Sequence, residues 1–154
     1  MFGTAILWTH AIAGALWLGA SASFTIAGLA LVAGSEEQRS FVERGAGRIN
    51  ACAMLAAVLL VITGMLNLGR VFQLRAGSLS HAFLYVLGVK IVLYIAMLMT
   101  LGVAMRAIPA MRFELGRGIE GAAPRAMRTM LRVHIAILSM GGIAMILGLW
   151  LVGS

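Results

Sequence analysis

Residues 80–105 read SHAFLYVLGVKIVLYIAMLMTLGVAM, a long apolar run with a single charge, Lys90, near its middle. In an α-helix, with a rise of about 1.5 Å per residue, the Lys90 ammonium lies about 12 Å inside this segment. The run is long enough to cross a bilayer, because a spanning helix needs about 20 mostly apolar residues. The sequence therefore predicts a membrane-spanning helix over residues 81–105 that carries an intramembrane lysine.

Lys90 is the only lysine of the chain, and a charge near the centre of a spanning helix costs about 2.5 to 3.5 kcal/mol. The acidic residues all lie between the apolar runs, at Glu36, Glu37, Glu43, Glu114 and Glu120. No carboxylate of the chain is therefore expected to neutralise Lys90 within the bilayer. The charge can instead snorkel to the interface, be lost by deprotonation on desolvation, or be met by a bound anion or metal.

The composition predicts an integral membrane protein. The 154 residues are 62% hydrophobic and 11% charged, more apolar than one small soluble core can accommodate. Three further runs, at about 5–32, 49–69 and 131–152, also reach the length of a spanning helix. The first run is longer than the apolar core of a signal peptide, and no basic residue precedes it. We therefore expect one all-α domain over residues 1–154, a four-helix up-down-up-down bundle in the membrane.

The distribution of basic residues predicts the orientation. The connections before residue 49 and after residue 105 carry nine of the twelve basic residues, whereas the second connection carries only Arg70 and Arg75. Because short cytoplasmic loops are enriched in arginine and lysine, both termini are expected outside, in a bacterial inner membrane. The net charge of +7 is thus a topology signal. Aromatic residues do not alternate with basic ones as in nucleic-acid-binding chains, so no nucleic-acid partner is expected.

Polar residues fall on one face of each of the first three predicted helices at 100° per residue. The face of 5–32 carries His10, Ala13, Gly14, Trp17, Ser21 and Gly28. If the predicted helix 49–69 is continued by one residue, one of its faces carries Cys52, Ala56, Thr63, Asn67 and Arg70. The face of 81–105 carries Phe83, Val86, Lys90, Tyr94, Met97 and Leu101, with His81 on the opposite side. Alternating helix directions bring His10, Thr63, Asn67, Arg70 and Lys90 into the outer leaflet together.

A porphyrin meets the requirements of this cluster. His10 offers an imidazole ligand, Gly14 and its neighbour Ala13 allow a flat group to approach, and Arg70 or Arg75 can pair with propionates. Lys90 is then either the second axial ligand, as a neutral amine, or a propionate partner. The chain has a single cysteine and no Cys-x-x-Cys-His, so the expected cofactor is non-covalent haem b, with His10 and Lys90 as candidate iron ligands.

Other interpretations stay open. The face around His10 is also typical of a close helix-packing seam, and Lys90 of a snorkelling side chain. Copper is the alternative cofactor, because the soft thioether sulfur of methionine suits Cu(I). Methionines also fill apolar cores. The candidate copper ligands are Met97, Met99, Met105 and Met111. His134 is expected to be interfacial or hydrogen-bonded. Hydrolase and kinase chemistry is excluded for want of a catalytic triad, a phosphate loop or a carboxylate pair.

Three stretches resemble a known family. They are THAIAGALWLGASASF at 9–24, TGMLNLG at 63–69 and LGVKIVLYIAMLMTLGVAMRAIPAM at 87–111. They look like the copper-resistance D (CopD) family and are similar, more distantly, to the HemJ family of membrane protoporphyrinogen oxidases. The first resemblance implies copper passage across the inner membrane. The second implies haem b held by a histidine and a lysine, which match His10 and Lys90. The continuation ASASFTIAG after Leu18 and Gly19 departs from the HemJ pattern, which implies a haem-binding scaffold rather than oxidase activity.

The sequence therefore predicts a haem b-binding membrane protein that serves as a redox or electron-transfer subunit. The candidate site residues are His10, Gly14, Asn67, Arg70, Lys90 and Tyr94. Glycine-rich helix faces need covering, so a homo-oligomer or a larger membrane complex is expected, with a redox partner or a quinone. The alternatives are a copper-handling protein that uses His10 and methionines, and a structural subunit without a cofactor.

Overall fold

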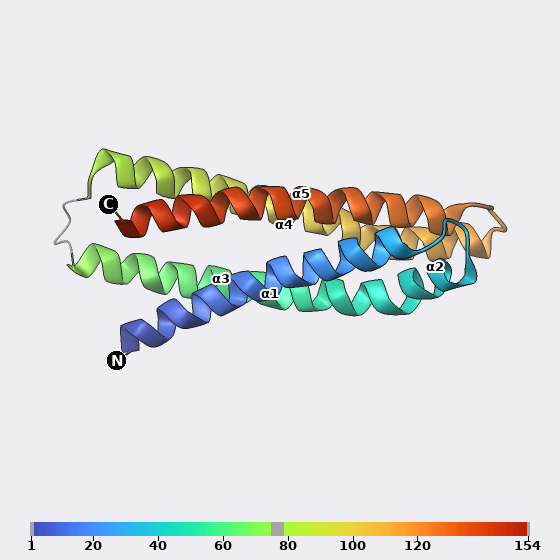
Figure 1. Cartoon of the computed structure of the whole chain (residues 1–154), viewed down its shortest axis with the longest axis horizontal. Helices are drawn as coiled ribbons and strands as arrows, with labels where there is room; N and C mark the ends of the chain where they lie inside the picture. Colours follow the sequence, from blue (N-terminus) through green and yellow to red (C-terminus); the bar gives the residue numbers. More distant parts are fainter. Residues whose placement is uncertain (1, 75–78, 154) are drawn as a thin grey trace.

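The computed structural model describes residues 2–74 and 79–153, and this part of the chain is helical throughout apart from its turns (Figure 1). The elements are α1 (Phe2–Ala30), α2 (Glu36–Ser40), the π-helix η1 (Phe41–Gly45), α3 (Ala46–Leu74), α4 (His81–Gly116) and α5 (Ala122–Gly153). Arg75, a predicted propionate partner, lies outside the described residues.

Four of the helical stretches are long and apolar enough to cross a membrane: Gly3–Ala30, Glu36–Leu74, His81–Gly116 and Ala122–Trp150. The long helices run in alternating directions, so that the two ends of the chain lie at the same end of the bundle (Figure 1). The predicted all-α, up-down-up-down bundle is therefore confirmed. Below, this end is called the terminus end, and the opposite end, with α2, η1 and the α4–α5 turn, is called the arginine-rich end.

The helices are longer than the apolar runs that predicted them. The helix α4 has 36 residues, which corresponds to about 54 Å, against about 30 Å for the hydrocarbon core of a bilayer. The connections expected at 33–48 and 106–130 are largely helical, because α2, η1 and the near ends of α4 and α5 occupy them. Buried Met111 and Met127 lie in these extensions, so helix packing continues beyond the apolar segments.

The bundle consists of two antiparallel pairs, α1 with α3 and α4 with α5, joined mainly along α1 and α5. Small residues allow this approach. A Cβ added at Gly28 of α1 would lie 2.9 Å from Leu131 Cδ2 of α5, and one added at Gly141 of α5 would collide with Leu18. Contacts between α3 and α4 are sparse by comparison. The helix α1 therefore connects the two pairs.

Aromatic residues fill the centre of the bundle. Trp17 and Phe24 of α1 are almost fully buried. The ring of Trp17 meets that of Tyr94 of α4 edge to face, with 5.4 Å between centroids. The Tyr94 hydroxyl donates a hydrogen bond of 2.6 Å to the carbonyl of Ala57 on α3. Tyr94 thus links α4 to α3 where these helices otherwise make few contacts.

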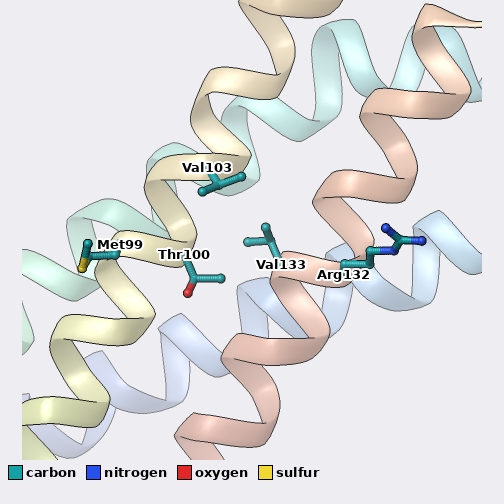
Figure 2. A pocket seen from close by; sticks show the side chains of 5 residues that line it. All are labelled: Met99, Thr100, Val103, Arg132 and Val133. Carbon is teal, nitrogen blue, oxygen red and sulfur yellow. The ribbon is translucent and has the colours of Figure 1, made fainter.

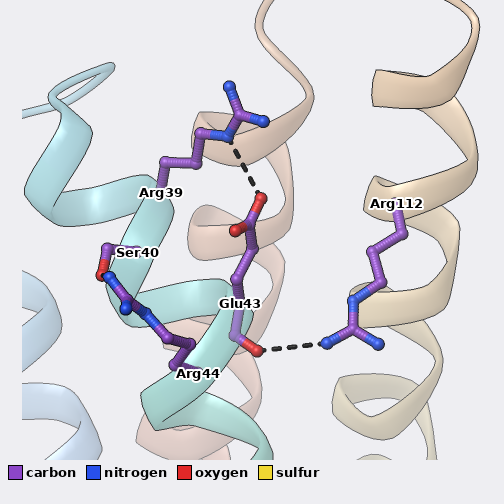
Figure 3. A network of polar contacts seen from close by, with 5 residues as sticks. All are labelled: Arg39, Ser40, Glu43, Arg44 and Arg112. Carbon is purple, nitrogen blue, oxygen red and sulfur yellow. Dashed lines mark hydrogen bonds and ion pairs between the residues drawn. The ribbon is translucent and has the colours of Figure 1, made fainter.

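A polar network holds the arginine-rich end together (Figure 3). Within the helical connection, Arg39 pairs with the Glu43 carboxylate at 3.1 Å, and Arg44 donates hydrogen bonds to the Ser40 hydroxyl. Arg112 of α4 donates to the backbone carbonyl of Glu43 in η1, at 3.2 Å. This contact joins the α1–α3 half of the bundle to α4 at the end where the basic residues gather.

Candidate functional site

His10 and Thr63 face each other at the contact of α1 with α3. The distance from His10 Nδ1 to Thr63 Oγ1 is 2.8 Å, and the imidazole is half-buried. A Cβ added at Gly64 would lie 3.4 Å from His10 Cε1, so the glycine leaves room for the ring. The structure therefore brings together two residues that the sequence placed on facing helices.

The Thr63 hydroxyl orients the His10 ring. Its single hydrogen can be donated to the carbonyl of Leu59, at 2.7 Å, and the oxygen then accepts from His10. In this arrangement His10 Nδ1 carries the ring hydrogen and donates the 2.8 Å hydrogen bond. Nε2 keeps a free lone pair in the neutral imidazole. This is how a metal-binding histidine is commonly oriented.

Lys90 of α4 lies at the same end of the bundle as His10, with its side chain half-buried. A Cβ added at Gly148 of α5 would lie 3.0 Å from Lys90 Nζ, so the amine rests against a glycine of the neighbouring helix. We call His10, Thr63 and Lys90 the His10 site. Its two titratable groups come from different helix pairs.

The other predicted site residues have contacts within the bundle. Gly14 packs on α3, where an added Cβ would lie 3.9 Å from Leu60 Cδ2, and Tyr94 is engaged with Trp17 and Ala57. The guanidinium of Arg70 covers Gly3, at the terminus end of α1. Asn67 is half-buried one turn beyond Thr63. Roles for these four residues in binding a cofactor stay predictions.

The methionines proposed for copper do not share one face of α4. Met97 and Met111 are buried, whereas Met99 is 72% exposed and Met105 is 42% exposed. Met97 and Met111 are also 14 positions apart, or about 21 Å along the helix. The four sulfurs therefore cannot bind a single ion. In the part of the chain that the structure describes, no three residues among His, Cys, Asp and Glu gather as a metal site either.

The structure contains a second polar cluster, at His134 and Asn50, of which the sequence indicated only His134. His134 of α5 is fully buried, not interfacial, and its Nε2 lies 3.1 Å from Asn50 Oδ1 of α3. The ring of Phe24 stacks on it, with 4.3 Å between centroids. Asn50 shares its helix face with buried Ala53 and Ala57, about 220° from the line through Thr63. Following that buried alanine face towards residue 46 would have revealed Asn50. Cys52, which the helical periodicity placed on the same face as Thr63, is exposed.

A hollow of the surface lies elsewhere, between α4 and α5 (Figure 2). It measures about 450 Å³ and is lined by Met99, Thr100, Val103, Arg132 and Val133. The Arg132 side chain extends away from Thr100 and Val103, which leaves the walls largely apolar (Figure 2). In a membrane-spanning bundle such a groove faces lipid. It is separate from the His10 site.

Comparison with known proteins gives no match to a family model, to a curated protein or to a solved structure.

Proposed function

We propose that this chain is a membrane protein that binds haem b non-covalently at the His10 site and takes part in electron transfer. The observation that carries the proposal is the hydrogen bond between His10 and Thr63. It holds an imidazole inside an apolar bundle with Nε2 free to ligate iron, which is the requirement for an axial haem ligand.

Lys90 is the second element of the site. It lies at the same end of the bundle as His10, whereas the acidic side chains of the described residues lie at the opposite end. As a neutral amine it can ligate iron, and as an ammonium it can pair with a propionate. Arg70, at the terminus end, is a further propionate partner. A bound haem supplies one-electron redox chemistry, and these residues hold and orient it.

The alternative functions have less support. Copper handling through the methionines of α4 requires them to converge, and they lie on different sides of the helix. A cofactor-free structural subunit leaves the orientation of His10 and the intramembrane lysine without a purpose. Many helix faces carry large exposed apolar side chains that lipid or a second subunit can cover, so a homo-oligomer or a larger complex belongs to the proposal.

An absorption spectrum of the detergent-purified full chain tests the proposal. A Soret band with a reduced α band is expected. His10→Ala should abolish both bands, whereas the matched control His81→Ala, an exposed histidine at the start of α4, should leave them unchanged. Copper in metal analysis without haem bands would support the copper alternative. If the wild-type protein is expressed with ample haem and carries neither haem nor copper, both the haem proposal and the copper alternative are overturned.

A further inference from the structure

The interior of the bundle holds a group of buried polar atoms that the His10 site does not use. In residues 2–74 and 79–153, four buried side-chain atoms have no hydrogen-bond partner: Trp17 Nε1, Ser21 Oγ, Asn50 Nδ2 and His134 Nδ1. All four residues are at most 2% exposed. Buried polar atoms in folded proteins are nearly always paired, with protein groups or with ordered water, so these atoms call for a ligand.

Trp17 and Ser21 lie on α1, Asn50 on α3 and His134 on α5. Phe24 stacks on the His134 ring, Ser21 lies about 4.5 Å before Phe24 along α1, and Trp17 lies one further turn away. On α3, the helix that carries Asn50, the small side chains of Ala53 and Ala57 are buried as well. The unpaired atoms are thus spread along about 10 Å of the bundle interior. We call Trp17, Ser21, Asn50 and His134 the interior polar site.

The hydrogen-bonding needs of this site identify its ligand. If Asn50 Oδ1 accepts from His134 Nε2, then Nδ1 is an unpaired acceptor and the amide nitrogen an unpaired donor. If the amide is turned, its nitrogen donates to Nε2, Nδ1 becomes a donor and Oδ1 an acceptor. Either way, one donor and one acceptor remain. A simple anion satisfies only donors and a cation only acceptors, whereas water satisfies both.

The charge of the surroundings agrees with a neutral ligand. The buried polar residues of the described chain are Ser21, Gln38, Asn50, Thr63 and His134, none with a permanent charge. Met130 and Val42, in the elements that lead to the arginine-rich end, are fully buried. Towards the centre the site continues to Ser21 and Trp17. We propose that the interior polar site binds water molecules, which hydrogen-bond to His134 Nδ1 and to the other unpaired polar atoms.

Water-edited solid-state NMR on the ¹⁵N-labelled full chain in lipid bilayers tests this proposal without any variant. Polarisation from water should reach the His134 ring and the Trp17 indole several-fold faster than the backbone amide of Ile137, which is as deeply buried on the same helix as His134. Build-up at His134 no faster than at Ile137 would show a dry interior and overturn the proposal. The measurement does not involve haem, so it is independent of the proposed function.

Two variants locate the water. Asn50→Leu should slow the build-up at His134 at least twofold and change its ring ¹⁵N shifts. Ser21→Ala, a smaller change if Asn50→Leu fails to fold, should slow the build-up at Trp17. The control is Ser139→Ala on α5, whose exposed hydroxyl bonds only its own helix, and it should change neither signal. Unchanged build-up in folded Asn50→Leu and in Ser21→Ala would contradict the assigned site.

Discussion

The Thr63 hydroxyl determines which nitrogen of His10 is available. A threonine that donates to the carbonyl four residues earlier is a common feature of helices, and it leaves the oxygen as an acceptor. Here that acceptor faces an imidazole on the neighbouring helix. The hydrogen bond orients the ring, which is the usual role of a group behind a metal ligand.

Thr63→Val should therefore weaken haem binding. Valine keeps the size of threonine and removes the acceptor, so His10 loses its fixed ring orientation. Loss of such a partner typically costs 10- to 100-fold in affinity, and we expect this range in haem titrations of the apoprotein. Thr100→Val is the control, because Thr100 makes the same bond within its own helix, to Ala96, far from His10. Equal effects of the two changes would remove Thr63 from the site.

Lys90→Met should preserve membrane insertion and alter the haem. The substitution removes a charge that costs about 2.5 to 3.5 kcal/mol near the centre of a span, so the amount of inserted protein should stay the same or rise. Haem content, axial-ligand spectrum or redox potential should change. Ile91→Met, at a lipid-exposed neighbouring position, should change none of them. A silent Lys90→Met would assign Lys90 to snorkelling instead.

His10 and His134 show what a sequence reveals about single residues. His10 could be paired with Thr63 because both lie in long apolar runs whose helical phase and direction are fixed. His134 and Asn50 lie near the ends of their predicted helices, where the pattern does not determine burial. The burial of Asn50 and His134 depends on how far α3 and α5 extend beyond the apolar runs. Ring orientation and the contact of Lys90 with Gly148 depend on side-chain packing, which periodicity does not describe.

Among the elements, the turn after α4 is fixed by glycine geometry. The amide of Ile119 bonds the carbonyl of Glu114, and the amide of Gly118 bonds that of Leu115. This is a Schellman motif, in which the residue after the C-cap has a positive φ. Gly118 has φ of 72°. The turn thereby directs α5 back along α4, and the ion pair of Arg125 with Glu114, at 2.7 Å, lies beside it.

Two glycine substitutions in this turn should have opposite effects. Gly118→Ala should destabilise the protein by about 1 to 2 kcal/mol, because an L-residue is strained in the left-handed region. Gly116→Ala, in the last turn of α4, should stabilise it by up to about 1 kcal/mol. An added Cβ meets nothing within 4 Å at either position, so sterics do not confound the comparison. Unfolding in mixed micelles measures the stability of both variants. A Gly118→Ala variant as stable as the wild type would contradict the expected backbone strain at position 118.

The sequence predicted where the helices are more reliably than where they end. The length of an apolar run follows the thickness of the bilayer. The runs 49–69, 81–105 and 131–152 lie inside helices, whereas the run 5–32 extends two residues past the end of α1. Helix ends depend on local groups instead, such as the Ser80 hydroxyl, which accepts from the amide of Phe83 at the start of α4. Between residues 106 and 116, arginines and a glutamate end the apolar run while the backbone stays helical, even past Pro109.

For the whole molecule, the orientation in the membrane stays a prediction. The positive-inside rule places the arginine-rich end in the cytoplasm. In a Cys52→Ala background, Arg117→Cys in the α4–α5 turn should be protected from a membrane-impermeant maleimide added to intact spheroplasts. Thr4→Cys, near the N-terminus, should be labelled. Labelling of the turn with protection of position 4 would reverse the orientation and put the His10 site in the inner leaflet.

The pairing of α1 with α5 joins the first helix of the chain to the last. At a translation rate of about 5 to 20 residues per second, roughly 100 residues separate their synthesis, or about 5 to 20 s. During that interval Phe24 and Gly28 of α1 have no α5 beside them, although α3 can already be in place. Quality-control proteases that recognise incompletely packed membrane helices therefore have a period in which to act. A ribosome that stops before α5 leaves this face of α1 open permanently, so truncated chains should be degraded rather than accumulate.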